Sequence, residues 1–162
     1  MSKRITHELT YDAPLADVAA MLADPAFREQ VCDDQHVLRH EVSVSGSAED
    51  GDLEVTIDQV QAADGIPSFA KKFVGDEINI VQVETWTSPE AGDISVTIPG
   101  KPGQMSGTAV LAESGGTTTE TVTLDIKVNI PLVGGKIEGL VADLLLKALK
   151  SENRTGRAYL SS

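Results

Sequence analysis

Residues 129–154 read NIPLVGGKIEGLVADLLLKALKSENR, and this stretch decides the fold. Its large apolar residues recur every three or four positions, which is typical of a helix with one buried face. The predicted buried face carries Val133, Ile137, Leu140, Val141, Leu144, Leu145, Ala148 and Leu149. A face this long must cover another element, and the preceding sequence predicts a sheet.

Three glycines, Gly134, Gly135 and Gly139, lie in the first turns of this helix. Glycine costs about 1 kcal/mol relative to alanine in a helix. Burial of each large apolar side chain contributes roughly 1.5–3 kcal/mol, so we expect the helix to form despite the glycines. Two interpretations of them stay open: a close approach or bend against a strand, and a gap between helix and sheet that leads into a cavity.

Alternating apolar and polar residues dominate the chain before this helix. Residues 3–11 alternate as a half-buried strand, and residues 12–34 have helical spacing that Asp24-Pro25 breaks into two short helices. Further strands are predicted at residues 37–45, 53–60, 77–87, 94–98, 104–112 and 117–130, with a helical turn around residues 69–74. Because short turns join successive strands, we expect an antiparallel meander. The predicted class is α+β: a sheet of about seven strands, two short helices after the first strand, and a long C-terminal helix packed across the sheet.

The composition narrows the class of protein. A length of 162 residues suits a single domain over residues 1–162, and the net charge of -12 argues against nucleic-acid binding. The sequence has no apolar run long enough to span a membrane and no signal-peptide pattern at MSKRITHELTYD, so a cytoplasmic location is expected. With a single cysteine, Cys32, and three histidines without ligand spacing, we predict no disulfide, metal or cofactor.

The order of elements and four stretches of sequence resemble a known superfamily. The stretches are YDAP at residues 11–14, PSFAKKFVG at 67–75, QVETW at 82–86 and IPLVGGKIEGLV at 130–141. The chain resembles the START-like, or SRPBCC, superfamily of helix-grip domains, and more narrowly an actinobacterial family of uncharacterised START-like domains. The resemblance implies a curved sheet and a deep apolar cavity beneath the long helix, holding a lipid, sterol, polyketide or other hydrophobic small molecule. It carries over no catalytic residue.

Candidate pocket residues follow from the apolar faces. Phe69 and Phe73 in the irregular segment are expected to form a lid or mouth. The other predicted lining residues are Trp86, Val96, Met105, Leu124, Ile137, Leu140, Val141 and Leu144.

Three polar residues are candidates for a role in the pocket. His7 and His40 fall on the apolar side of their strands; a ligand-orienting or acid–base role is possible, and a hydrogen-bonded core or rim histidine is the favoured interpretation. Glu84 shares a face with Trp86. The favoured interpretation places the opposite face, with Val81 and Val83, in the core; the alternative makes Glu84 a buried carboxylate that needs a partner.

Three functions remain open. The first, which we favour, is a non-enzymatic binding or carrier domain for a hydrophobic small molecule. The second is a cyclase- or aromatase-type enzyme, which requires His7, His40 and Glu84 to converge in one cavity. The third is a protein-interaction module, such as a homodimer formed through the apolar segment around Phe69.

Overall fold

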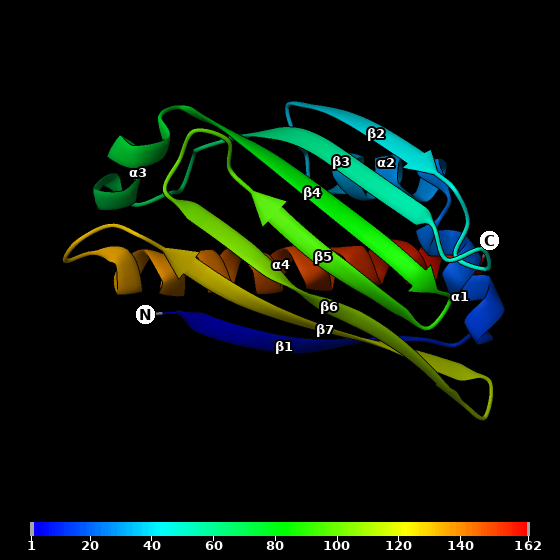
Figure 1. Ribbon diagram of the computed structural model, residues 1–162. Coiled ribbons are helices and arrows are strands. Elements are labelled where there is room, and N and C mark those ends of the chain that lie inside the picture. The colour runs from blue at the N-terminus through cyan, green and yellow to red at the C-terminus, as the bar shows by residue number, and fades with distance from the viewer. Residues whose placement is uncertain (1, 162) are drawn as a thin grey trace.

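A single antiparallel sheet of seven strands organises the chain. The structure, a computed structural model, describes residues 2–161. The sheet has the order β1-β7-β6-β5-β4-β3-β2 (Figure 1). The strands are β1 (Lys3–Tyr11), β2 (Arg39–Ser45), β3 (Leu53–Ala62), β4 (Glu77–Ser88), β5 (Ala91–Thr97), β6 (Gly103–Ser114) and β7 (Thr117–Val128). Strands β2 to β7 follow one another in sequence order, and β1 pairs with β7, which confirms the predicted α+β meander.

The helices lie where the sequence predicts them. They are α1 (Leu15–Leu22), α2 (Pro25–Asp34), α3 (Ser68–Val74) and α4 (Gly134–Ser161). Asp24 caps α2, because its side chain accepts a hydrogen bond of 2.9 Å from the backbone N–H of Ala26. The predicted break at Asp24-Pro25 is therefore confirmed, since α1 ends at Leu22 and α2 begins at Pro25.

The long helix α4 crosses the inner face of the curved sheet (Figure 1). Its main contacts are with β1, β7, α1 and α2. Strands β3, β4 and β5 belong to the part of the sheet that curves away from α4. This one-sided packing leaves room between α4 and the middle of the sheet, and it is what positions the site.

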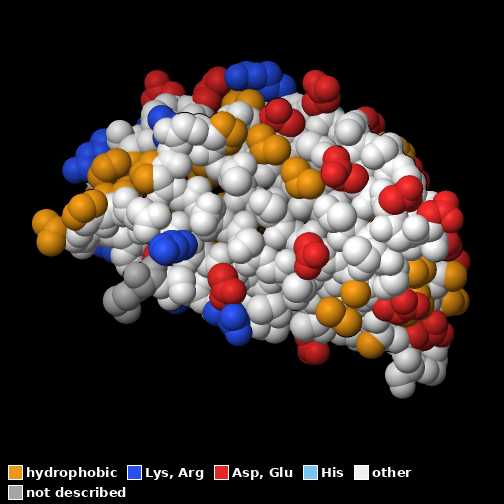
Figure 2. All heavy atoms as spheres, viewed as in Figure 1, with side chains coloured by type: hydrophobic (Ala, Val, Ile, Leu, Met, Phe, Trp, Pro, Cys, Tyr) orange, Lys and Arg blue, Asp and Glu red, His pale blue; other side chains and the backbone are white. Residues whose placement is uncertain are grey.

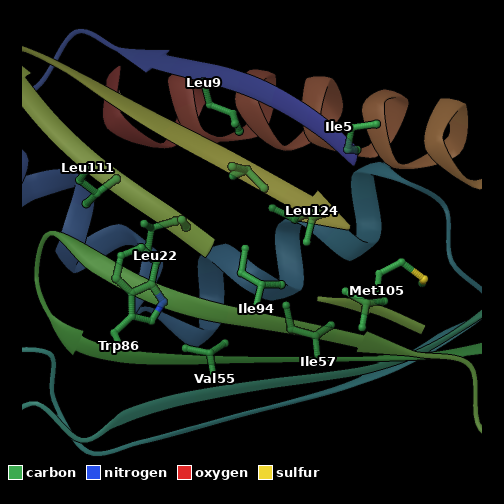
Figure 3. Close-up of a cluster of buried hydrophobic side chains, with 14 of the residues drawn as sticks. Ile5, Leu9, Leu22, Val55, Ile57, Trp86, Ile94, Met105, Leu111 and Leu124 are labelled. Carbon is green, nitrogen blue, oxygen red and sulfur yellow. The ribbon is translucent and has the colours of Figure 1, made fainter. Parts of the chain in front are cut away.

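The inner face of β4 carries Glu84 and Trp86, which are 4% and 2% exposed. Trp86 lies opposite Leu53 and Glu84 opposite Val55 in β3, and both partners are buried. Figure 3 shows Trp86, Val55 and Ile57 in the same apolar cluster. The favoured prediction for this strand was wrong: Val81 and Val83 are only half-buried and lie on the outer face. Strand alternation identifies the two faces but not which one is inside, and the partner that allows Glu84 to be buried comes from α2.

The glycines at the start of α4 do not share one role. A Cβ atom on Gly134 would lie 2.6 Å from the carbonyl oxygen of Val128, so this glycine permits a close approach of α4 to the end of β7. A Cβ atom on Gly135 or Gly139 would meet nothing within 4 Å. The close-approach interpretation therefore holds for Gly134. Neither Gly135 nor Gly139 lines the cavity described below, so these two give the gap interpretation no support.

Candidate functional site

A cavity of about 510 Å³ lies between α4 and the inner face of the sheet. Side chains from α2, β3–β7, α3 and α4 form its wall. The predicted pocket residues that line it are Phe73, Val96, Met105, Leu124, Ile137, Leu140, Val141 and Leu144. Their alternation on the strands and their helical spacing on α4 place them on the faces that enclose this space.

Two predicted apolar residues do not line the cavity. Trp86 is buried in the core beside it, where its indole N–H donates a 3.0 Å hydrogen bond to Oε1 of Glu84. Phe69 packs instead under the ammonium group of Lys136, which lies 4.2 Å from its ring centroid. The aromatic residue of this segment that faces the cavity is Phe73.

The rim of the cavity carries exposed polar residues. Asp64 and Lys101 lie on the side of α3 and the β5–β6 turn, and His36 and Arg154 lie on the side of α2 and α4. Figure 2 shows one face of the molecule, where acidic side chains are scattered and hydrophobic side chains gather at the end that carries α3 and again at the opposite end. Solvent therefore reaches the cavity at its rim, whereas its inner wall is mostly apolar.

A buried ion pair stands at the inner wall. The guanidinium of Arg28 in α2 donates two hydrogen bonds to Glu84 in β4, of 2.8 and 3.1 Å, and a third of 2.9 Å to the carbonyl oxygen of Leu22. Glu84 also accepts hydrogen bonds from Gln82 and Trp86. Burial opposes ionisation of this carboxyl, but the charge and hydrogen bonds of Arg28 prevail and hold the pKa of Glu84 below its ordinary value. Glu84 and Arg28 therefore satisfy each other, and Glu84 has little left to offer a ligand.

Two more carboxyl groups line the cavity near this pair. Glu120, in β7, is 3% exposed, and its Oε1 has no hydrogen-bond partner among residues 2–161. Glu152, in α4, is half-buried and faces the same cavity. Burial, reinforced by the charges of Glu152 and Glu84, raises the pKa of Glu120 well above its usual range. Burial raises the pKa of Glu152 to about 7, although Arg28 opposes the shift.

The histidines do not join this cluster. His7 is half-buried on β1, opposite Val122, and does not line the cavity. His40 lies on β2 with its Nε2 atom 3.2 Å from a carboxylate oxygen of Asp33. The cavity therefore does not bring His7, His40 and Glu84 together. Within residues 2–161, no three His, Cys, Asp or Glu side chains lie close enough to hold a metal ion.

Sequence reasoning missed Arg28, Glu120 and Glu152. Two of them carried a signal: Glu120 has the parity of Val122 and Leu124 on β7, and Glu152 follows Leu145, Ala148 and Leu149 at helical spacing. Burial of a carboxyl group is costly unless the group has a partner, so an acidic residue on a predicted buried face is a candidate site residue. This rule identifies both Glu120 and Glu152. Arg28 had no such signal, because nothing in α2 indicates that its side chain meets a carboxylate from β4.

Cys32 also lines the cavity, as a buried thiol of α2. Burial, with a smaller effect from the charge of Asp33, raises the pKa of Cys32 to about 11. The thiolate needed for nucleophilic attack is thus scarce at neutral pH. His36 lies beyond the end of α2 with a positive φ of 57°, so it does not continue the helix that would place it over Cys32.

Comparisons with known proteins agree with this architecture. Residues 6–160 match the family described as protein of unknown function DUF2505. The chain is similar to the uncharacterized protein Mb0491c of Mycobacterium bovis, with 31% identity over 123 residues that cover 72% of this chain and 70% of the relative.

Two solved structures share the fold. The di-domain ARO/CYC protein StfQ from the steffimycin biosynthetic pathway has a TM-score of 0.69 at 10% identity, over 98% of this chain and 50% of that chain. Norcoclaurine synthase from Thalictrum flavum, in complex with dopamine and hydroxybenzaldehyde, has a TM-score of 0.62 at 15% identity, over 99% of this chain and 88% of that chain. At these identities the likeness concerns the fold, and it confirms the helix-grip architecture that the resemblance implied.

No helix within residues 2–161 is a candidate for a membrane-spanning segment. None of the helices there combines the length and the apolar character that crossing a bilayer requires.

Proposed function

The chain belongs to the family described as protein of unknown function DUF2505, and we propose that it binds a hydrophobic small molecule, such as a lipid or polyketide, between its sheet and α4. The observation that carries this proposal is the cavity of about 510 Å³. Its volume lies within the range of roughly 300–1,000 Å³ that is usual for ligand pockets. Close-packed interiors contain few voids larger than a water molecule, so a mostly apolar space of this size that opens to solvent at its rim has the character of a ligand pocket.

The wall of the cavity fits an apolar occupant. We assign the ligand contacts to Phe73, Val96, Met105, Leu124, Ile137, Leu140, Val141 and Leu144. Leu144 remains 45% exposed although it lies on the apolar face of α4, so a ligand that covers it would bury additional apolar surface. The bound small molecules named for norcoclaurine synthase lend support through a shared fold only.

A cyclase- or aromatase-type enzyme receives less support. StfQ has the same fold, but the acid–base group expected here required His7 and His40 in the cavity, and neither lines it. The proposal is therefore a binding or carrier function, placed in the cytoplasm. Cell fractionation tests the location. A homodimer through the segment around Phe69 is a separate prediction, and sedimentation at high protein concentration tests it.

The experiment for the binding function is native mass spectrometry of freshly purified protein, followed by extraction with organic solvent. We expect a defined excess mass that the solvent removes. Leu140→Trp fills the cavity and should lower the occupied fraction, whereas Leu146→Trp, on the same helix but outside the cavity wall, should retain it. A wild-type protein that is free of ligand, and that also fails to take up an added apolar dye, would overturn the proposal.

A further inference from the structure

The polar end of the cavity has more buried acid than buried base. Among residues 2–161, the buried side chains include one cation, Arg28, and its charge is already matched by Glu84 through two hydrogen bonds. Glu120 and Glu152 line the same cavity and have no buried cation of their own. The other basic side chains on the cavity wall, Lys101, Lys147 and Arg154, are exposed.

Glu120 is the group that points to a ligand. It is 3% exposed, it lines the cavity, and its Oε1 has no partner among the described residues. A buried polar atom without a partner is costly, and native proteins keep one where a ligand or ion completes the site. The carboxyl oxygens of Glu120 and Glu152 are therefore available to accept hydrogen bonds from a molecule in the cavity.

We infer that the cavity selects an apolar molecule carrying one basic amine, whose ammonium group lies between Glu120 and Glu152 while its hydrocarbon part contacts the apolar wall. This inference rests on the proposed binding function and names the chemical class of its ligand. An ammonium group donates hydrogen bonds to both carboxyl groups, and their carboxylate forms match its charge, which Arg28, already paired with Glu84, does not do.

Binding of such an amine is coupled to proton release. Burial favours the protonated form of Glu120, and the pKa of about 7 leaves Glu152 partly protonated near neutral pH. An arriving ammonium ion favours the carboxylate forms, so protons leave these two groups for the buffer while the amine keeps its own. The groups that act on the pair are Arg28 and Cys32 from α2, Glu84 from β4 and Tyr11 from β1. Of these, the pKa of Cys32 is about 11 and that of Tyr11 is also raised, so neither titrates between pH 6 and 8.

Three probes of equal chain length test the inference: decylamine, decanol and decanoic acid, each titrated into the ligand-free protein by calorimetry. We expect decylamine to bind about tenfold or more tightly than decanol, as a charge-assisted hydrogen bond in a buried site predicts, and decanoic acid to bind least well. Repeating the decylamine titration at pH 7 in buffers of different ionisation enthalpy should reveal proton release. The affinity should rise from pH 6 to pH 8.

Variants locate the effect. Glu120→Gln and Glu152→Gln should each lower the preference for decylamine over decanol and reduce proton release. Glu54→Gln, on an exposed position of β3, should change neither. Proton release on decylamine binding is also measured on the wild-type protein, so the inference can be tested even if one of the variants does not fold.

The outcomes separate the two proposals. Equal affinity for decylamine and decanol without proton release would overturn the amine inference and leave the binding function standing. Tighter binding of decanol would instead mean that protonated Glu120 donates to a neutral ligand oxygen, which also overturns it. Failure of all three probes and of the apolar dye would overturn the binding function itself.

Discussion

Arg28 in α2 and Glu84 in β4 meet through two hydrogen bonds of 2.8 and 3.1 Å, and their side chains are only 1% and 5% exposed. This pair joins the helices that follow the first strand to the middle of the sheet. It also places a fixed charge pair beside the cavity, so the inner wall is polar at one end and apolar elsewhere.

Breaking this pair should destabilise the protein strongly. Arg28→Met or Glu84→Gln leaves a buried charge without its partner, and such changes cost about 3–5 kcal/mol. Urea unfolding followed by tryptophan fluorescence and circular dichroism measures the loss. The matched control is the exposed pair Arg4–Asp125, where Arg4→Met should cost far less because solvent screens the two charges. Equal losses at the two sites would contradict the assignment of Arg28 and Glu84 as a buried pair.

Removing the carboxyl group of Glu152, whose pKa is raised, should change how the free energy of unfolding depends on pH. The pKa of Glu152 rises from an ordinary 4.5 to about 7 on folding, so the folded state holds its proton over a range where the unfolded state has lost it. The contribution of Glu152 to the free energy of unfolding is fully present below pH 4.5, and it is lost as the pH rises towards 7. At about 1.4 kcal/mol per pKa unit the full effect is on the order of 3 kcal/mol, and less where solvent enters the cavity.

Glu152→Gln should therefore lose less stability between pH 4.5 and 7 than the wild-type protein does. Glu84 and Asp34, whose pKa values are lowered, contribute in the opposite direction in both proteins. The difference between the two pH profiles reports Glu152 together with Glu120, because the charge of Glu152 raises the pKa of Glu120 and the two carboxyl groups titrate as a pair. Parallel pH profiles for wild type and Glu152→Gln would show that this carboxyl is not perturbed, and Glu54→Gln serves as the exposed control.

Glycines within α4 should respond in opposite ways to alanine. A Cβ on Gly156 would lie 2.5 Å from the ring of Tyr11, which is 1% exposed and cannot easily move. Gly156→Ala should therefore destabilise the protein by about 1–3 kcal/mol. Gly139→Ala meets open space and should stabilise it by up to about 1 kcal/mol, since alanine is the better helix former. Thermal unfolding compares the two variants, and a stabilising Gly156→Ala would contradict the packing of α4 over β1.

Cys32 should react slowly with thiol reagents in the folded protein. Its pKa of about 11, two units above the ordinary 9.0, lowers the thiolate fraction about 100-fold at neutral pH, and burial restricts access further. The rate of modification by a disulfide reagent at pH 7.5 should rise at least that much when urea unfolds the chain. A rate that is the same in both states would mean that the thiol is exposed and that the α2 wall of the cavity is wrongly placed.

The fold was predictable from sequence because its signals are local. Alternation placed the strands, Asp24-Pro25 placed the break between the first helices, and the spacing from Val133 to Leu149 placed α4. The apolar wall of the cavity followed from the same faces. The polar cluster did not, because the burial of Glu84 depends on Arg28, which is 56 residues away in sequence. A single strand carries no information about a partner from another element, and for that reason the inner and outer faces of β4 were interchanged.

The most direct test of the account is a dye titration that asks whether the space beneath α4 is a binding site. Nile red, an uncharged apolar dye, should gain fluorescence on the folded wild-type protein and on Leu146→Trp, and the gain should be lost in Leu140→Trp, whose added ring fills the cavity. Circular dichroism should confirm that all three proteins are folded. Equal dye binding by the three proteins, or none by the wild-type protein, would contradict the claim that this cavity holds a hydrophobic ligand.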